Sequence, residues 1–136
     1  MMTREEVESY LLRMGLDFEE VEDGLWVIQP ADENGVNVVA IYSPPLLLLR
    51  LKVMDLPEDP GDGRFAALYR KMLEWNAGDI LHGSYGIEEN EVLLSDALEL
   101  ETMDFAELRS SYESMVYAAS SHLPRLIELV PVPQQG

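Results

Sequence analysis

The sequence predicts an α+β fold, a two-layer sandwich of an antiparallel sheet and helices. Short runs of alternating apolar residues are separated by tight-turn signals, and strands joined by tight turns must be antiparallel. Two segments, residues 3–6 and 104–107, have the composition of capping boxes, which begin helices. The chain has 136 residues, which is enough for one hydrophobic core. We therefore expect a single domain over residues 1–136, with an ordered core over about 3–130.

The first half of the sequence reads as one helix followed by four strands. Apolar residues at helical spacing predict a helix over 4–14, which ends at Gly15. Alternating apolar runs predict four strands: residues 18–22, 25–28, 36–42 and 46–54. The turn Asp23-Gly24 joins the first two strands, and Asn34-Gly35 supplies positive φ before the third. A turn at residues 43–45 separates the third and fourth strands, because Pro44 and Pro45 have no N–H to donate to a strand partner.

The second half reads as helix, two strands and a long helix. A helical stripe over 65–75 follows the acidic loop 57–63 and is closed by the segment 76–78. A hairpin of strands 80–85 and 91–98 comes next, turning near 88–90. The last stripe runs from Phe105 to Val130 and contains Pro124, so we expect a kink or a break there. We expect residues 131–136 to form a flexible tail.

The composition excludes several classes of function. The chain carries 26 acidic and 9 basic residues, for a net charge of −17. Binding to nucleic acid phosphates or to an anionic membrane needs clustered Lys and Arg, so we expect neither. There is no cysteine, and hence no disulfide framework or thiolate zinc site. With no signal-peptide pattern and no apolar run long enough to span a membrane, we expect a soluble cytoplasmic protein.

No catalytic signature is present, and we expect no cofactor and no metal. His82 and His122 are the only histidines, and no third ligand stands at a spacing that would complete a metal site. We assign both to ordinary surface or packing roles. The glycines of 61–63 lie among acids that would repel phosphate, so we interpret this segment as a flexible entry to the helix. The acidic clusters fall in turns and at element ends, where they form a solvated surface.

The hairpin over residues 36–54 is apolar on both of its faces. In its second strand one face carries Leu47, Leu49, Leu51 and Val53, and the other carries Leu46, Leu48 and Met54 with Arg50 and Lys52. A sheet with one solvated face alternates apolar and polar residues more cleanly. Either the helices cover one face and the other meets a subunit or a ligand segment, or the helices divide between both faces. Arg50 and Lys52 also make the second face locally less acidic.

The order of elements resembles the fold of the type III secretion chaperones of the CesT/Tir-chaperone type and the YbjN-like proteins. Three segments carry the likeness. Residues 72–76 end the middle helix, residues 98–100 precede the last helix, and residues 121–126 contain a Leu-Pro-x-Leu sequence. The resemblance covers about residues 3–130. It implies no catalytic residue and no cofactor.

The resemblance implies a non-enzymatic, chaperone-like or regulatory module, a homodimer that holds an extended or partly unfolded protein segment. Family members dimerise partly through the middle helix. The candidate dimer or partner interface residues are Leu46, Leu48, Arg50, Phe65, Leu68, Tyr69 and Met72. Two alternatives stay open: an acidic adaptor or mimic that binds a basic partner surface, and a small enzyme that uses carboxylates or a metal.

Overall fold

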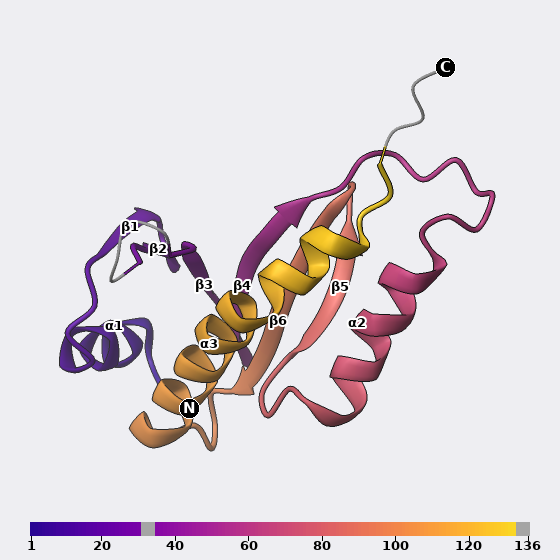
Figure 1. The fold of residues 1–136 in the computed structure, drawn as a ribbon. Helices are drawn as coiled ribbons and strands as arrows, with labels where there is room; N and C mark the ends of the chain where they lie inside the picture. The colour runs from indigo at the N-terminus through magenta and orange to yellow at the C-terminus, as the bar shows by residue number, and fades with distance from the viewer. Residues whose placement is uncertain (31–34, 133–136) are drawn as a thin grey trace.

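A computed structural model describes residues 1–30 and 35–132. Within this part of the chain, three helices lie along one side of a six-stranded antiparallel sheet (Figure 1). The elements are α1 (Arg4–Arg13), β1 (Phe18–Glu22), β2 (Leu25–Ile28), β3 (Val38–Ser43), β4 (Leu46–Asp55), α2 (Ala66–Gly78), β5 (Ser84–Glu88), β6 (Glu91–Glu99) and α3 (Phe105–Leu129). The predicted α+β class and the order of its elements are confirmed.

The sheet has the strand order β1-β2-β3-β4-β6-β5. Strands β1 to β4 form a meander in which each strand pairs with the next. Strand β4 then pairs with β6, and β5 lies outside β6 as the second edge strand. The chain therefore passes through α2 and β5 before it completes the middle of the sheet.

The core fills the space between the sheet and the helices. Alternate residues of the inner strands are buried: Trp26, Ile28, Val38, Ala40, Leu47, Leu49, Leu51 and Val53. The helices contribute Val7, Leu11, Leu68, Met72, Leu108, Met115 and Leu126. Burying one such side chain contributes about 1.5–3 kcal/mol relative to leaving it in water. This packing, rather than helix propensity alone, stabilises the helical layer.

Caps begin the first and last helices where the sequence predicts them. The side chain of Thr3 accepts from the backbone N–H of Glu6, and the Glu6 carboxylate accepts from the backbone N–H of Thr3. The predicted capping box at 3–6 is thus confirmed. At α3, the carboxylate of Asp104 accepts from the backbone N–H of Glu107 at 2.8 Å, which is one of the two hydrogen bonds of the capping box predicted at 104–107.

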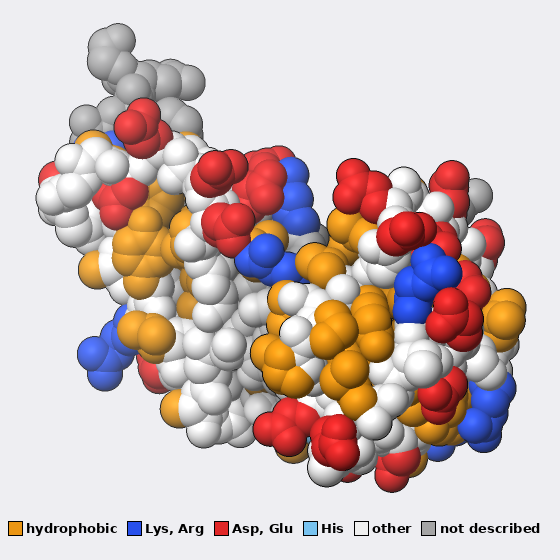
Figure 2. Space-filling model, turned by 180° about the vertical axis from the view of Figure 1, so that it is seen from behind, with side chains coloured by type: hydrophobic (Ala, Val, Ile, Leu, Met, Phe, Trp, Pro, Cys, Tyr) orange, Lys and Arg blue, Asp and Glu red, His pale blue; other side chains and the backbone are white. Residues whose placement is uncertain are grey.

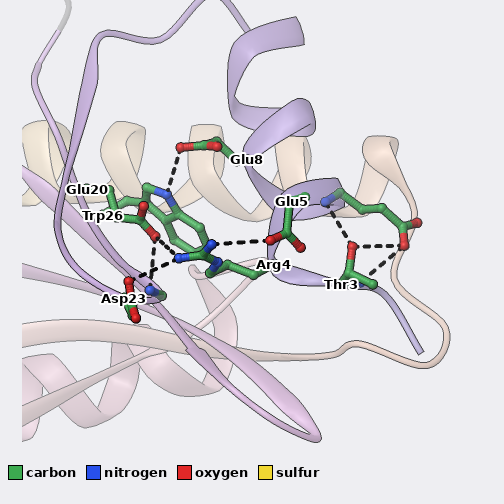
Figure 3. A network of polar contacts seen from close by, with 9 residues as sticks. Thr3, Arg4, Glu5, Glu8, Glu20, Asp23 and Trp26 are labelled. Atoms are coloured by element: carbon green, nitrogen blue, oxygen red, sulfur yellow. Dashed lines mark hydrogen bonds and ion pairs between the residues drawn. The ribbon is translucent and has the colours of Figure 1, made fainter.

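Polar contacts join α1 to the β1–β2 hairpin (Figure 3). Arg4 Nη1 lies 3.0 Å from Glu20 Oε2 in β1 and 3.3 Å from Asp23 Oδ1 in the turn. The indole N–H of Trp26 in β2 donates to Glu8 Oε1 at 3.4 Å. These contacts set the position of α1 over the part of the sheet that the longer α3 does not cover.

Several predicted boundaries differ from the observed ones. Strand β3 begins at Val38 rather than at 36, and β5 begins at Ser84 rather than at 80. The predicted positive φ of Asn34 lies outside the described residues, as do 133–136 of the predicted tail. The predicted break at Pro124 is wrong, because α3 continues through it to Leu129. The proline removes one helical hydrogen bond, and exposed Ser120, four residues earlier, leaves its carbonyl close to water.

Candidate protein-binding surface

The helices leave the other side of the sheet uncovered. Strand register places partly exposed side chains from β2, β3, β4, β5 and β6 side by side on this surface. We call it the open face. Its members are Leu25, Val27, Val39, Ile41, Leu46, Leu48, Arg50, Lys52, Ser84, Gly86, Leu93, Ser95 and Ala97. The possibility that the helices divide between both faces is therefore wrong for the described chain.

One residue predicted on this face lies elsewhere. The β4–β6 register shifts between Lys52 and Met54, so Met54 pairs with Val92, which is fully buried. Met54 packs against the core instead of joining Leu46 and Leu48. A bulge of this kind inserts one residue and changes which side the following side chains face. The sequence prediction assumed strict alternation along the strand, and this assumption leaves out the bulge.

The open face is apolar in the middle and charged at its edges. Figure 2 shows this side of the molecule, where a group of hydrophobic side chains lies right of centre and carboxylates lie above, below and to the right of it. In the row across four strands, Leu25 stands beside Ile41, Ile41 beside Leu48, and Leu48 beside Ala97. Cross-strand neighbours of this kind form a continuous apolar strip.

The two basic residues of the open face are each paired with acids. Arg50 Nη2 lies 2.5 Å from Glu88 Oε2. Lys52 Nζ lies 2.8 Å from Asp55 Oδ1 and 3.5 Å from Glu91 Oε1. The hydrogen bond to Asp55, with the charges of Asp55 and Glu91, raises the pKa of the Lys52 ammonium. Neighbouring carboxylates thus balance both cations, and the face has no surplus of positive charge.

Small residues on β5 and β6 leave a depression in the open face beside β4. A shallow depression of about 560 Å³ is lined by Leu48, Arg50, Gly83, Ser84, Ser95, Asp96 and Ala97. A second one, of about 330 Å³, lies along β3 and β4 and is lined in part by Val39, Ile41 and Leu93. Arg50 contributes to both, so the two depressions are neighbours on one surface.

The seven predicted interface residues fall into two groups. Leu46, Leu48 and Arg50 lie on the open face and are partly exposed. The other four come from the α2 region. Three of these are buried within the chain, namely Phe65, Leu68 and Met72. Tyr69 is half-buried, stacks on Phe65 and donates its hydroxyl to Asp59 at 2.9 Å. The interface stays a prediction, and its exposed part is the open face together with Tyr69.

A buried polar cluster between α2, α3 and β5 was not predicted. His122 of α3 is only 6% exposed, and its Nδ1 lies 2.7 Å from the hydroxyl of Tyr85. Its Nε2 lies 2.5 Å from Asp79 Oδ2. The ring stacks on Trp75, with centroids 3.8 Å apart and 3° between the planes. Burial, reinforced by the charge of Asp79, raises the pKa of Tyr85.

This cluster has the character of a structural joint. Both ring nitrogens of His122 have a partner, and a buried histidine needs such partners to avoid a desolvation cost. The packing role predicted for His122 agrees with this arrangement. The sequence did carry one signal for it, since His122 falls on the buried stripe of α3 between Ala119 and Leu126. Nothing in the spacing along the chain indicated Tyr85 or Asp79 as partners.

No group of three or more His, Cys, Asp or Glu side chains in residues 1–30 and 35–132 is arranged to hold a metal ion. Among the helices described, none is both long enough and apolar enough to cross a membrane.

The sequence matches the CesT_Tir_1 family model over residues 1–131. The chain belongs to this family. The match covers nearly the whole chain and agrees with the resemblance found from the order of elements. No curated protein matches the sequence.

Solved structures show the same fold at low sequence identity. A chain of the heterodimeric ExoU–SpcU complex from the type III secretion system of Pseudomonas aeruginosa has a TM-score of 0.67 and 16% identity, and the alignment covers 91% of this chain and 97% of that one. A chain of the ExsC–ExsE complex has a TM-score of 0.65 and 17% identity, covering 93% and 97%. YbjN of E. coli, described as a putative transcription regulator, has a TM-score of 0.65 and 12% identity, covering 97% and 96%.

Proposed function

We propose that this protein is a non-enzymatic, chaperone-like or regulatory binding module that holds an extended or partly unfolded segment of another protein. The observation that carries the proposal is the open face: an apolar sheet surface that no described element of the chain covers. A contiguous apolar surface that the rest of the fold leaves uncovered marks an interaction site in a folded protein. We further propose that the protein is a homodimer and acts in the cytoplasm.

The family and the similar structures support binding to protein. Several of the similar structures are complexes, among them ExoU–SpcU and the HopA1–SchA chaperone–effector complex. Those names describe those proteins, and at this level of identity the likeness extends to the fold. What it adds is that this fold occurs in proteins that bind other proteins. The chain's own open face supplies a place for such binding.

The proposal is tested by diluting a chemically unfolded model protein into buffer and following its aggregation by light scattering. We expect an equimolar amount of this protein to suppress the scattering. The variant Leu48→Ser, on the open face, should suppress it less. The variant Leu73→Ser is the matched control, because Leu73 is a leucine of α2 that is 68% exposed on the other layer. Equal suppression by both variants, or none by the wild type, would contradict the proposal.

The homodimer is tested separately by sedimentation at several protein concentrations. We expect a mass of two chains that dissociates on dilution. A strict monomer at high concentration would reject this part of the proposal. It would leave the binding of unfolded protein standing, because the scattering experiment measures that directly.

An acidic adaptor that binds a basic partner surface is the second candidate, and the net charge of −17 favours it. The two candidates differ in how binding responds to salt. An interaction that is purely electrostatic weakens steeply as ionic strength rises, whereas apolar burial does not. Suppression of aggregation that persists at high salt therefore favours the chaperone-like module.

A further inference from the structure

We propose that the open face receives an amphipathic helix with an apolar stripe and Lys or Arg along its borders. The inference rests on the proposed function and specifies the chemistry of the partner. It uses three features of the surface: the width of its apolar strip, its missing second layer, and the sign of the charge around it.

The width of the apolar strip fits a helix better than a single strand. The row that contains Ile41 and Leu48 runs across four adjacent strands, from Leu25 in β2 to Ala97 in β6. Neighbouring strands lie about 4.8 Å apart, so the row extends about 14 Å across the sheet. A helix with its side chains is about 10–12 Å wide, whereas one extended chain covers the width of a single strand. Helices are also what covers the opposite face of this sheet (Figure 1).

The depressions on the face give such a helix places for its side chains. The larger one has a floor of small residues from β5 and β6, including Ser84, Ser95 and Ala97. Leu48 and Arg50 of β4 stand beside it. Both depressions also have charged residues in their lining, Asp96 in the larger one and Glu88 and Glu91 in its neighbour along β3, so a helix with apolar side chains flanked by basic ones fits them.

Carboxylates surround the strip on several sides. Glu88 and Glu91 stand at one end of β5 and β6, Glu99 at the other end of β6, Asp55 at the end of β4, and Glu19 on β1 beside Val27. Two cations on the face, Arg50 and Lys52, oppose these five acids and are already paired. The border therefore favours a partner that brings its own positive charge.

The same charge argues against a second copy of this chain as the occupant. Two copies would bring together two borders of the same sign on chains that each carry a net charge of −17. Like charges facing each other across an interface cost free energy, and opposite charges are complementary. A basic amphipathic helix meets both requirements of the surface, the apolar and the electrostatic.

The test measures the binding of labelled synthetic peptides by fluorescence anisotropy. The first peptide forms a helix with a Leu stripe and Lys borders, and the second has Glu in place of Lys. The third has the composition of the first in an order that destroys the stripe, and the fourth alternates Leu and Lys as a strand does. We expect the first peptide to bind at least about tenfold more tightly than each of the others, and to weaken as salt is raised.

Variants of this protein locate the site. Leu48→Ser should weaken binding of the first peptide by about tenfold, and Leu73→Ser on α2 should leave it unchanged. The double variant Glu19→Gln with Glu99→Gln should weaken it about threefold at low salt. The control variant, Glu58→Gln with Glu113→Gln, removes the same amount of charge at positions away from the open face. It should weaken binding of the first peptide only as far as the change in net charge does. Circular dichroism of each variant confirms that it is folded.

Four results would overturn the inference. Equal binding of the Lys and Glu peptides would remove the basic partner, and tighter binding of the strand peptide would replace the helix with an extended segment. Loss of a dimer in Leu48→Ser would identify the occupant as a second copy. If no peptide binds while the protein still suppresses aggregation, this inference fails and the proposed function stands. If the first peptide binds but aggregation is not suppressed, the site stands and the proposed function fails.

Discussion

At the scale of single residues, His122 shows how a charged type becomes part of a core. Its two ring nitrogens meet Tyr85 and Asp79, and its ring face meets Trp75. Trp75 and Asp79 lie at the C-terminal end of α2 and Tyr85 lies in β5, so the imidazole connects α2, α3 and β5. Removing one partner would leave a buried polar atom without a hydrogen bond, which costs about 1–3 kcal/mol.

The raised pKa of Tyr85 gives this joint a dependence on alkaline pH. A phenol whose pKa is higher in the folded state holds its proton more tightly there than in the unfolded chain. Its contribution to stability is complete below the unfolded pKa of about 10 and is lost as pH rises above it. We expect the free energy of unfolding, measured with urea, to begin to fall near pH 10 and to go on falling as the pH rises toward the raised pKa of Tyr85.

The variant Tyr85→Phe tests the assignment. It should be about 1 kcal/mol less stable than the wild type at neutral pH, since the hydrogen bond to His122 is lost. Its decline above pH 10 should be shallower. Some decline remains, because burial also raises the pKa of Tyr112 and of Tyr69. A decline as steep as that of the wild type would show that other groups are responsible.

At the scale of elements, the entry to β5 depends on a close approach of two backbones. Gly83 has φ of +89°, and a Cβ added there would lie 2.7 Å from the carbonyl oxygen of Ser95 in β6. The glycine thus lets the loop after α2 turn into the edge strand directly beside β6. The β5–β6 pairing, and with it one wall of the open face, depends on this turn.

We expect Gly83→Ala to lower the free energy of unfolding by about 2 kcal/mol, since it combines a strained φ with a clash against backbone. Gly86→Ala, two residues into β5, is the matched control, because nothing lies within 4 Å of the added methyl group. That variant should be neutral or slightly more stable. Urea unfolding of both variants measures the difference, and equal stabilities would show that β5 shifts to accommodate the methyl group.

At the scale of the whole molecule, the acidic surface and the open face are linked. The helices use their apolar stripes to cover one side of the sheet, and residues 1–30 and 35–132 contain no further element that covers the other. The strong net charge keeps such a surface from associating with others of its kind. The proposed homodimer is consistent with both features if its contact leaves the open face accessible.

Self-repulsion among the carboxylates should make stability depend on salt. Raising sodium chloride from about 10 mM to about 300 mM shortens the Debye length from about 30 Å to below 10 Å, and so screens the net charge. We expect the Tm to rise by roughly 4 °C, which corresponds to about 1 kcal/mol for a domain of this size. Calorimetry in salt and in an uncharged osmolyte separates screening from exclusion effects. A Tm that stays constant or falls with salt would contradict this picture.

Most elements of this fold were predictable from local sequence. Thr3 and Asp104 indicate the starts of helices, and Asp23-Gly24 indicates a hairpin. The alternation in β4 places Leu47 and Leu49 on one face of the sheet and Leu46 and Leu48 on the other. These signals depend on neighbours in the sequence. They therefore also indicated an apolar surface outside the core before any tertiary contact was known.

What could not be predicted depends on contacts between distant residues. The bulge after Lys52 is set by the pairing of β4 with β6, so it moves Met54 without any local sign. Phe65 and Met72 lie on an amphipathic stripe that suits a dimer interface and a core equally well, and the structure buries both in the core. The contact of His122 with Asp79 spans 43 positions, which no pattern along the chain reveals.

The strand order also determines when the sheet can form. The β1–β4 meander pairs strands that are adjacent in the sequence. The β4–β6 pair matches Leu46 with Glu99, so it forms only after α2 and β5, which lie between them in the sequence, have taken their positions. Folding slows when contacts between distant positions must form first. Until β6 arrives, the Leu-rich β4 is an unpaired edge, the kind of strand that invites aggregation. During its own synthesis, this chain therefore exposes the type of surface that we propose it shields in other proteins.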